Sequence, residues 1–301
     1  MTNFGIQTDG SDQSGTVHTD LISRDPLIGA VVADKFKIST VLGTGAWGRV
    51  YQARDLNGDK DIALKALHLH LVADQNMLLR FQREARSGFN LKHPNICEVF
   101  SQGVLPTGQP FIVMEYLRGE NLASLLRTQG VLSAREAISV FLGCALGLKG
   151  AQDQGIVHRD IKPANIFLTG EAESAAVKLL DFGMAKIVAE HNDLTQTGTG
   201  FGTIYYMSPE QVLGESVDTR SDIYALGCVM YEALSGRKVF SGKGAYQIMD
   251  QHVRELPAKL RNENGNIPLK LESIVLKALS KLPCERFQTA EELIDNLVGA
   301  E

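Results

Sequence analysis

Residues 158–165 read His158-Arg-Asp160-Ile-Lys162-Pro-Ala-Asn165 and place a carboxylate, a cation and an amide within one short segment. Transfer of a phosphoryl group needs little covalent chemistry, so positioning and neutralisation of charge supply most of the catalysis. Asp160 offers an acceptor for a hydroxyl proton, Lys162 a cation for the moving phosphoryl group, and Asn165 an oxygen ligand for a metal ion. The segment therefore predicts a site of phosphoryl transfer.

A second acidic motif lies downstream of the first. Asp181-Phe-Gly183 follows the apolar segment Val177-Lys-Leu-Leu180, which reads as a strand. Mg2+ is usually bound through one or two carboxylates together with substrate phosphates, and a carboxylate at a strand end suits that role. The two motifs together, in this order, are not expected by chance.

Upstream, a glycine-rich segment reads Gly43-Thr-Gly45-Ala-Trp-Gly48-Arg-Val50. Glycines at this spacing let a backbone fold close over phosphates, although a flexible hairpin turn explains the spacing equally well on its own. In a Rossmann fold the same spacing leads from a strand into a helix. Here strand-like sequence stands on both sides, so we expect a glycine-rich hairpin. Trp47 at its tip either covers the phosphates or is an exposed loop aromatic.

Lys65 ends the apolar segment Ile62-Ala-Leu-Lys65, which reads as a strand. An interior lysine is unfavourable unless an anion neutralises it. Glu84, on the helix expected over residues 74–90, can supply one negative charge, and the phosphates of a nucleotide can supply the other. The alternative interpretation is a lysine at the solvent-exposed edge of a strand.

The chain divides into a sheet-rich part and a helical part. Residues 1 to about 33 are polar without apolar periodicity, and we interpret them as a disordered arm. Beyond this arm, alternating patterns predict antiparallel strands at 36–42, 50–53, 62–67, 96–104 and 111–116, with one helix at 74–90. Helices are then expected at 121–128, 133–154, 218–235, about 244–254, 268–280 and 289–298.

The composition narrows the class of protein. With 301 residues, 44% hydrophobic and 22% charged, the chain has the proportions of a soluble globular protein. The formal net charge of −5 disfavours a nucleic-acid partner, which more often meets a basic surface. The four cysteines form no CxxC pair, which favours a reducing, cytoplasmic location. No membrane span is expected, because no apolar run reaches about 18 residues, and no secretory signal is expected, because the N-terminus lacks a basic region followed by an apolar one.

Taken in order, these motifs resemble the Hanks-type, or eukaryotic-like, protein kinases, especially their bacterial serine/threonine branch. The resemblance covers about residues 34–298. It implies an α+β, bilobal protein kinase fold: a small antiparallel N-lobe with helix C, about 34–116, and a larger, mainly helical C-lobe, about 117–298. It also implies ATP, with Mg2+ or alternatively Mn2+, and protein substrates that accept phosphate on Ser or Thr.

The resemblance assigns the chemistry to individual residues. It makes Asp160 the catalytic base, assisted by Lys162, and it makes Asn165 and Asp181 the Mg2+ ligands. Lys65 is implied to hold the α- and β-phosphates. The residues implied in nucleotide binding, which include the hinge Met114-Glu-Tyr-Leu117, are Leu42, Gly43, Thr44, Gly45, Ala46, Trp47, Gly48, Val50, Ala63, Lys65, Glu84, Met114, Glu115, Leu117 and Phe167.

Further residues match the framework of the family. Glu210 is implied to form a buried ion pair with Arg286, and Asp222 to brace the backbone at His158-Arg159. Removing one partner of a buried ion pair costs about 3–5 kcal/mol. These residues are therefore expected to support activity without touching the substrate.

The resemblance also indicates the substrate class and a mode of activation. Lys162 and Thr203 are typical of serine/threonine kinases. The loop between Asp181 and Glu210 offers Thr195, Thr197 and Thr199 as phosphorylation sites, since Arg159 gives a phosphorylated loop a cation. Self-association would allow autophosphorylation in trans. The alternative is that these threonines are ordinary loop residues.

Two positions depart from the family pattern. Ser208 stands where the family usually has Ala. Gly88 stands four residues after Glu84, where the family normally places an apolar side chain that stacks toward Phe182. Because a glycine inside a helix costs about 0.5–1 kcal/mol relative to alanine, we expect a helix C that is loosely held. The alternative is that neighbouring Phe89 or Leu91 already fills the space.

Two other functions are compatible with a nucleotide-binding fold of this kind. A pseudokinase would be favoured by the loss of Lys65, Asp160, Asn165 or Asp181, and all four are present. A small-molecule kinase with a related fold would generally lack Ser208-Pro-Glu210. The sequence leaves open whether the kinase is recruited by another protein or is a fragment of a longer one.

Overall fold

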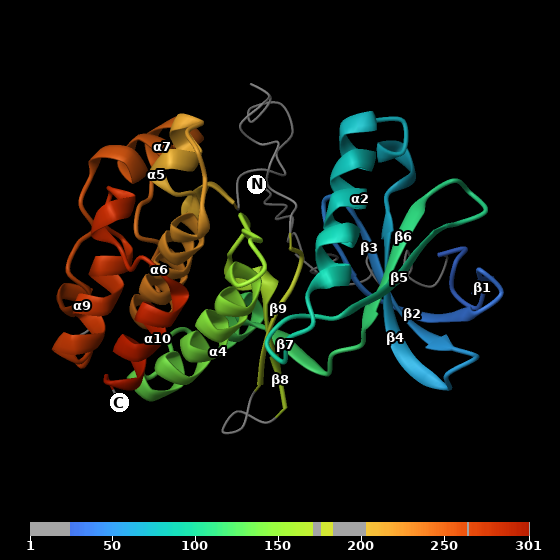
Figure 1. Ribbon diagram of the computed structural model, residues 1–301, viewed down its shortest axis with the longest axis horizontal. Helices are drawn as coiled ribbons and strands as arrows, with labels where there is room; N and C mark the ends of the chain where they lie inside the picture. Colours follow the sequence, from blue (N-terminus) through green and yellow to red (C-terminus); the bar gives the residue numbers. More distant parts are fainter. Residues whose placement is uncertain (1–24, 171–175, 183–202, 264, 301) are drawn as a thin grey trace, which may run out of the picture.

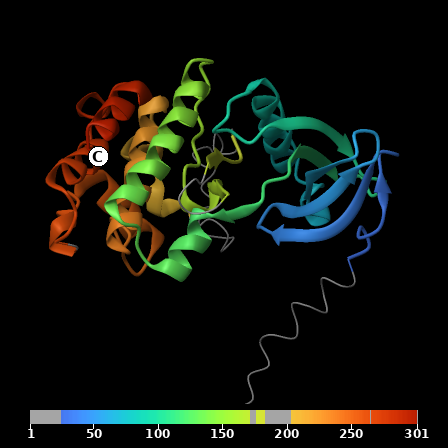
Figure 2. The ribbon, with the colours of Figure 1, turned by 90° about the horizontal axis from the view of Figure 1, so that it is seen from below.

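The computed structural model describes residues 25–170, 176–182, 203–263 and 265–300, apart from some side chains, Glu84 among them. An antiparallel sheet with one long helix forms one side of the molecule, and a group of helices forms the other (Figure 1). The two parts are also separate when seen from below (Figure 2). The α+β, bilobal fold expected from the sequence is confirmed.

The sheet side is built on alternating strands. β2 and β3 form the hairpin that carries the glycine-rich segment, and Val50 on β3 lies opposite Lys65 on β4. A buried cluster that includes Phe36, Tyr51 and Phe111 packs one face of the sheet. The order is β1-β2-β3-β4-β6-β5, with bounds β1 Val31–Val32, β2 Phe36–Thr44, β3 Gly48–Asp55, β4 Lys60–Leu67, β5 Val99–Val104 and β6 Pro110–Glu115.

The structure differs from the expected arm of residues 1–33, because residues 25–33 are part of the folded sheet side. Asp25 is buried and accepts hydrogen bonds from Arg49, from the Tyr51 hydroxyl at 2.9 Å and from the Leu27 backbone N–H at 2.9 Å. Val32 on β1 is buried in the same cluster. Residues 1–24 lie outside the described part of the chain.

The long helix of the sheet side is α2, Gln75–Asn90. It begins at Asp74, whose carboxylate accepts from the Asn76 N–H at 2.8 Å and so caps the first turn. Phe81 packs with Ile112 of β6 in a small buried cluster. The helix expected at 74–90 is therefore confirmed, and it lies beside β5 and β6.

The helical side is organised around α6, Thr219–Ser235, which is buried on nearly all faces as its apolar run from Ile223 to Leu234 predicts. The expected helices appear within about two residues of their predicted ends. None of the helices in the described part of the chain combines the length and the apolar character that a membrane span requires. The other helices are α3 Leu122–Gln129, α4 Ala134–Gln152, α5 Pro209–Leu213, α7 Ala245–Arg254, α8 Leu260–Glu263, α9 Leu269–Ala278 and α10 Ala290–Val298.

Short strands and 3-10 turns complete the fold. A three-stranded sheet, in the order β7-β8-β9, consists of β7 Gly119–Asn121, β8 Ile166–Thr169 and β9 Ala176–Leu179. The 3-10 turns are η1 Leu69–Leu71, η2 Pro163–Asn165, η4 Ile204–Tyr206 and η5 Pro283–Glu285.

Candidate active site

Asp160 lies at the centre of a polar cluster in the loop after α4. Lys162 Nζ is 2.8 Å from Asp160 Oδ2, and Asn165 Nδ2 donates to the same oxygen at 3.0 Å and to the Asp160 carbonyl at 2.8 Å. The Thr203 hydroxyl is 3.5 Å from Asp160 Oδ1 and 3.3 Å from Lys162 Nζ. The structure therefore brings Asp160, Lys162 and Asn165 together as the sequence predicts, and turns Oδ2 toward the two nitrogen groups.

The backbone of this loop is held from beneath by Asp222. The N–H groups of His158 and Arg159 donate to the two oxygens of the Asp222 carboxylate, each at 2.7 Å. Arg159 has a φ of 67°, in the left-handed region that a residue with a side chain seldom adopts. The predicted brace is confirmed, and the paired hydrogen bonds hold a strained residue directly before Asp160.

His158 fixes the loop through its ring. Its Nδ1 accepts from the Asp160 N–H at 3.3 Å, so Nε2 carries the hydrogen that it donates to the Leu180 carbonyl at 2.8 Å. Complete burial lowers the pKa of His158, which keeps the ring neutral. The ring also packs against Phe182, with centroids 4.3 Å apart. His158 thus connects the Asp160 loop with the Asp181 motif.

Lys65 on β4 contacts Asp181, which lies two residues after the end of β9. Its Nζ is 2.9 Å from Asp181 Oδ1, and the lysine is only 7% exposed, which excludes the alternative of a solvent-edge lysine. Asp181 has a φ of 60°, a second strained residue in the site. The side chain of Glu84 lies outside the described part of the chain, so its pairing with Lys65 stays a prediction.

The residues predicted as metal ligands lie close together. The Leu180 N–H donates to the Asn165 carbonyl at 2.9 Å, which places Asn165 beside the residue that precedes Asp181. Both side-chain hydrogen bonds of Asn165 are made by its nitrogen, Nδ2, so its amide oxygen can still act as a ligand. A carboxylate and an amide oxygen are ligands that Mg2+ accepts. The residues present therefore fit a magnesium ion.

The residues predicted to bind the nucleotide come from the β2–β3 hairpin, β4, α2 (Glu84), β6, the segment after β6, and β8. The β2–β3 hairpin carries residues 42–50, β4 carries Ala63 and Lys65, the end of β6 carries Met114 and Glu115, and β8 carries Phe167. Ala63 pairs in register with Met114 across β4 and β6. The positions on β2, β3, β4 and β6 thus lie on neighbouring strands of one sheet, whereas Phe167 belongs to the three-stranded sheet and Leu117 follows β6.

The glycine-rich hairpin is shaped by close backbone contacts. A Cβ on Gly48 would lie 2.2 Å from the Ala66 carbonyl oxygen, so glycine is required there, whereas a Cβ on Gly43 would meet no atom within 4 Å. The Trp47 carbonyl accepts from the His68 N–H at 2.9 Å, and His68 Nε2 donates to the Gly45 carbonyl at 2.8 Å. Close packing against Ala66 therefore requires glycine at position 48. The backbone at Gly43 has room for the predicted approach of phosphates.

Sequence reasoning missed a polar contact beside the hinge. Glu115 accepts from Lys178 Nζ at 2.6 Å and from the Glu98 N–H at 2.8 Å, and its own N–H donates to the Glu98 carbonyl at 2.9 Å. Lys178 lies on β9, so the contact links the end of β6 to the strand that precedes Asp181. The signal for it was a lysine in the otherwise apolar segment 177–180.

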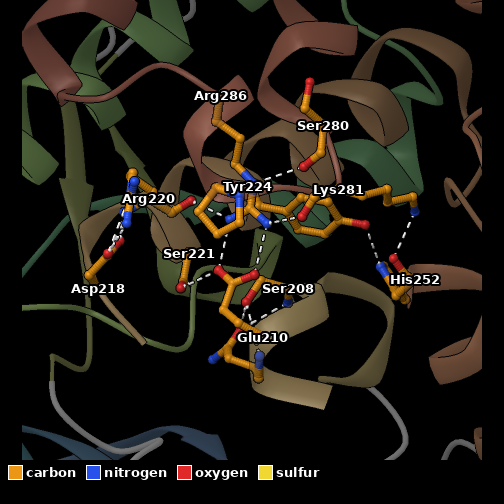
Figure 3. A network of polar contacts seen from close by, with 12 residues as sticks. Ser208, Glu210, Asp218, Arg220, Ser221, Tyr224, His252, Ser280, Lys281 and Arg286 are labelled. Carbon is orange, nitrogen blue, oxygen red and sulfur yellow. Dashed lines mark hydrogen bonds and ion pairs between the residues drawn. The ribbon is translucent and has the colours of Figure 1, made fainter. Parts of the chain in front are cut away.

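The predicted ion pair between Glu210 and Arg286 is confirmed (Figure 3). Two parallel hydrogen bonds of 2.7 and 2.8 Å join the guanidinium to the carboxylate, and Arg286 is only 1% exposed. Burial alone raises the pKa of Glu210, but hydrogen bonds from Arg286 and Ser221 outweigh that effect and hold it below its ordinary value. Arg286 also donates to the carbonyls of Ser280 and Lys281, which anchors α5 to the segment after α9.

The expectation of unfilled space beside Gly88 is wrong. A Cβ on Gly88 would lie 2.4 Å from Val99 Cγ2, so the space is filled by a side chain from β5. A cavity of only about 20 Å³ remains between Gly88, Val99 and Phe182. The hypothesis of a loosely held helix therefore loses its basis, and the glycine allows α2 to approach β5.

Gly88→Leu is accordingly expected to lower both activity and melting temperature. Overpacking of this kind costs about 1–3 kcal/mol, more than the gain of about 1 kcal/mol in helix propensity. Thermal melting and a phosphorylation assay measure both effects. The double variant Gly88→Leu/Val99→Ala is the matched control, since it removes the clashing methyl groups and should recover much of the loss. A single variant with raised activity and unchanged melting temperature would contradict the packing explanation.

The expected activation loop lies mostly outside the described part of the chain. Thr195, Thr197 and Thr199 fall within residues 183–202, for which no structure is described. Its end is described: Ser208 caps α5, and Glu210 makes the ion pair with Arg286. Assignments to the threonines therefore stay predictions.

Comparison with known proteins agrees with this arrangement. The family model "Protein kinase domain" matches residues 36–297. PknB, a serine/threonine-protein kinase of Mycobacterium leprae strain TN, is 40% identical over 270 residues, which are 89% of this chain and 43% of that protein. PknB of Mycobacterium tuberculosis strain H37Rv is 41% identical over 271 residues, again 89% of this chain and 43% of that protein.

A solved structure shares the fold as well. The crystal structure of the Mycobacterium tuberculosis PknI kinase domain matches with a TM-score of 0.71 and 28% sequence identity, over 91% of this chain and 98% of that one. The chain spans less than half the length of the curated relatives that it matches. The chain belongs to the protein kinase domain family and is similar to bacterial serine/threonine-protein kinases.

Proposed function

We propose that this chain transfers the γ-phosphoryl group of Mg-ATP to Ser and Thr hydroxyls of proteins. The observation that carries the proposal is the cluster of Asp160, Lys162 and Asn165 beside Asp181, because it combines an acceptor, a cation and metal ligands in one place. Membership of the kinase family supports the same reaction.

In the proposed reaction each described residue has one task. Asp160 accepts the proton of the substrate hydroxyl, and Lys162, 2.8 Å from that carboxylate, neutralises charge on the moving phosphoryl group. Asn165 and Asp181 hold Mg2+, which neutralises the phosphate oxygens when it is bound. Lys65 binds the α- and β-phosphates, and its contact with Asp181 keeps it beside the metal ligands.

For the nucleotide, we assign the adenine to the strands of the sheet side. Val50, Ala63 and Phe167 lie on β3, β4 and β8 and would sandwich the ring, while the backbone of 115–117 would bond its edge. The glycine-rich hairpin, tied to His68 at Gly45, would cover the phosphates. A reducing, cytoplasmic location is part of the proposal, because all four cysteines of the chain are free thiols.

Specificity for Ser and Thr over Tyr is supported by the contact between Lys162 and Thr203. Lys162 Nζ reaches both the Asp160 carboxylate and the Thr203 hydroxyl, so the segment before α5 lies directly beside the base. The test is to incubate the chain with Mg-ATP labelled in the γ-phosphate and a generic protein substrate, followed by phosphoamino-acid analysis. Phosphoserine and phosphothreonine are expected, and label confined to tyrosine would overturn the assignment.

Autophosphorylation is expected on at least one of Thr195, Thr197 and Thr199. A phosphate on this loop would give the Arg159 guanidinium an anion to bind. Mass spectrometry of active enzyme, compared with enzyme treated with a phosphatase, identifies the site and its effect on rate. The triple Thr→Ala variant should lose most of the gain in activity. Full activity of an enzyme whose loop is unmodified would contradict this prediction.

A further inference from the structure

Gln211 in α5 connects the end of the activation segment with the loop that carries Asp160. Its amide oxygen accepts from the Ser208 N–H at 3.0 Å and from the Ser208 hydroxyl at 3.2 Å. Its amide nitrogen, Nε2, donates to the Arg159 carbonyl at 3.1 Å. One side chain thus joins α5 to a residue that lies 52 positions earlier in the sequence.

The two ends of this amide cannot exchange places. The Arg159 carbonyl and the Gln211 amide oxygen are both acceptors, so only the nitrogen can face Arg159. Ser208, which is completely buried, holds the oxygen from the other side and accepts from the Gln211 N–H in a capping box. This gives a physical reason for serine at a position where the family usually has alanine: Ser208 orients the Gln211 side chain.

The bond to Arg159 acts on a strained residue. With φ at 67°, Arg159 keeps its conformation only if the surrounding contacts impose it. Asp222 binds its N–H at 2.7 Å, and Gln211 binds its carbonyl. That carbonyl belongs to the peptide group whose N–H is the Asp160 N–H, which donates to His158 Nδ1. Rotation of this peptide group would turn Asp160 away from Lys162 and Asn165.

We propose that Gln211 is a positioning residue for phosphoryl transfer, which sets the orientation of Asp160 through the 159–160 peptide group. The inference rests on the proposed function of Asp160 as the base. It also means that the position of the Ser208-Pro-Glu210 segment affects Asp160 through the hydrogen bond between Gln211 and Arg159. This route is separate from the contact between Thr203 and Lys162.

Gln211→Glu tests the proposal while keeping the helix cap. Glutamate serves equally well as the third residue of a capping box, so its carboxylate still accepts from the Ser208 N–H, but it has no N–H for the Arg159 carbonyl. We expect kcat to fall about tenfold, the loss that follows from one hydrogen bond to a strained site. The KM for ATP should stay within about twofold, since the nucleotide contacts are preserved, and the melting temperature should fall by only about 2–4 °C, as expected for the loss of one hydrogen bond.

Ser208→Ala is the matched control. It removes the hydroxyl but keeps the Ser208 N–H that holds the Gln211 oxygen, so kcat should fall less than in Gln211→Glu, while the melting temperature falls because the cap is weakened. If Gln211→Glu fails to fold, Gln211→Met removes the donor without adding a charge and should show the same loss of kcat. If the wild-type chain transfers phosphate and a folded Gln211→Glu or Gln211→Met variant has the same kcat, the role of Gln211 is overturned but the proposed function is not. A wild-type chain that transfers none would overturn the proposed function instead.

Discussion

Asp160→Asn is expected to lose nearly all phosphoryl transfer while it binds Mg-ATP with close to wild-type affinity. Asparagine has the size of aspartate and can still accept from Asn165, so the loop should keep its shape. It cannot take the proton of a substrate hydroxyl, and it leaves Lys162 without the anion now 2.8 Å away. Loss of a positioned general base lowers rates by about 10²–10⁴-fold.

The measurement is the rate of transfer to a protein substrate, together with calorimetric titration of Mg-ATP. Asp153→Asn is the matched control, because Asp153 is an exposed aspartate at the end of α4 whose partner is Lys149. The control should keep wild-type activity. Turnover of Asp160→Asn within about threefold of wild type would remove Asp160 from the role of base.

Asp181→Ala is expected to remove most of the Mg2+-dependent affinity for ATP. Asp181 is the only carboxylate among the proposed ligands, and it also sits 2.9 Å from Lys65. The variant therefore loses a metal ligand and alters the surroundings of the lysine proposed to bind the phosphates. We expect Mg-ATP affinity to fall at least about tenfold, a change of about 1.4 kcal/mol.

Titrations of ATP with and without Mg2+ separate the two effects. The gain in affinity that Mg2+ gives the wild type should vanish in Asp181→Ala, while the melting temperature shows whether the variant is folded. Asp181→Asn is the control for size, since it keeps one oxygen but lacks the negative charge. Unchanged Mg-ATP affinity in folded Asp181→Ala would mean that another residue holds the metal.

Most of the fold could be predicted because its signals are local. The buried helix α6 shows its apolar run directly in the sequence, and the strands of the sheet alternate as half-buried strands do. The central residues of the site were also within reach, since Asp160, Lys162 and Asn165 belong to one short segment. Their contacts in the structure are those that the segment implies.

What could not be predicted depends on partners far away in the chain. Residues 25–33 are held against the sheet by Asp25, whose hydrogen-bond partners Arg49 and Tyr51 stand 24 and 26 residues later in the sequence. No local pattern marks such a contact. The error at Gly88 has the same origin, because the side chain that fills the space belongs to Val99 on another element.

The most direct test of the account follows single-turnover transfer of labelled γ-phosphate from Mg-ATP to one serine-containing protein substrate, with wild type and Asp160→Asn in parallel. We expect labelled phosphoserine to accumulate in proportion to the amount of wild-type enzyme, and to fall by about 10²-fold or more in the variant at equal nucleotide occupancy. Equal labelling by the two proteins, or none by wild-type enzyme saturated with Mg-ATP, would contradict it.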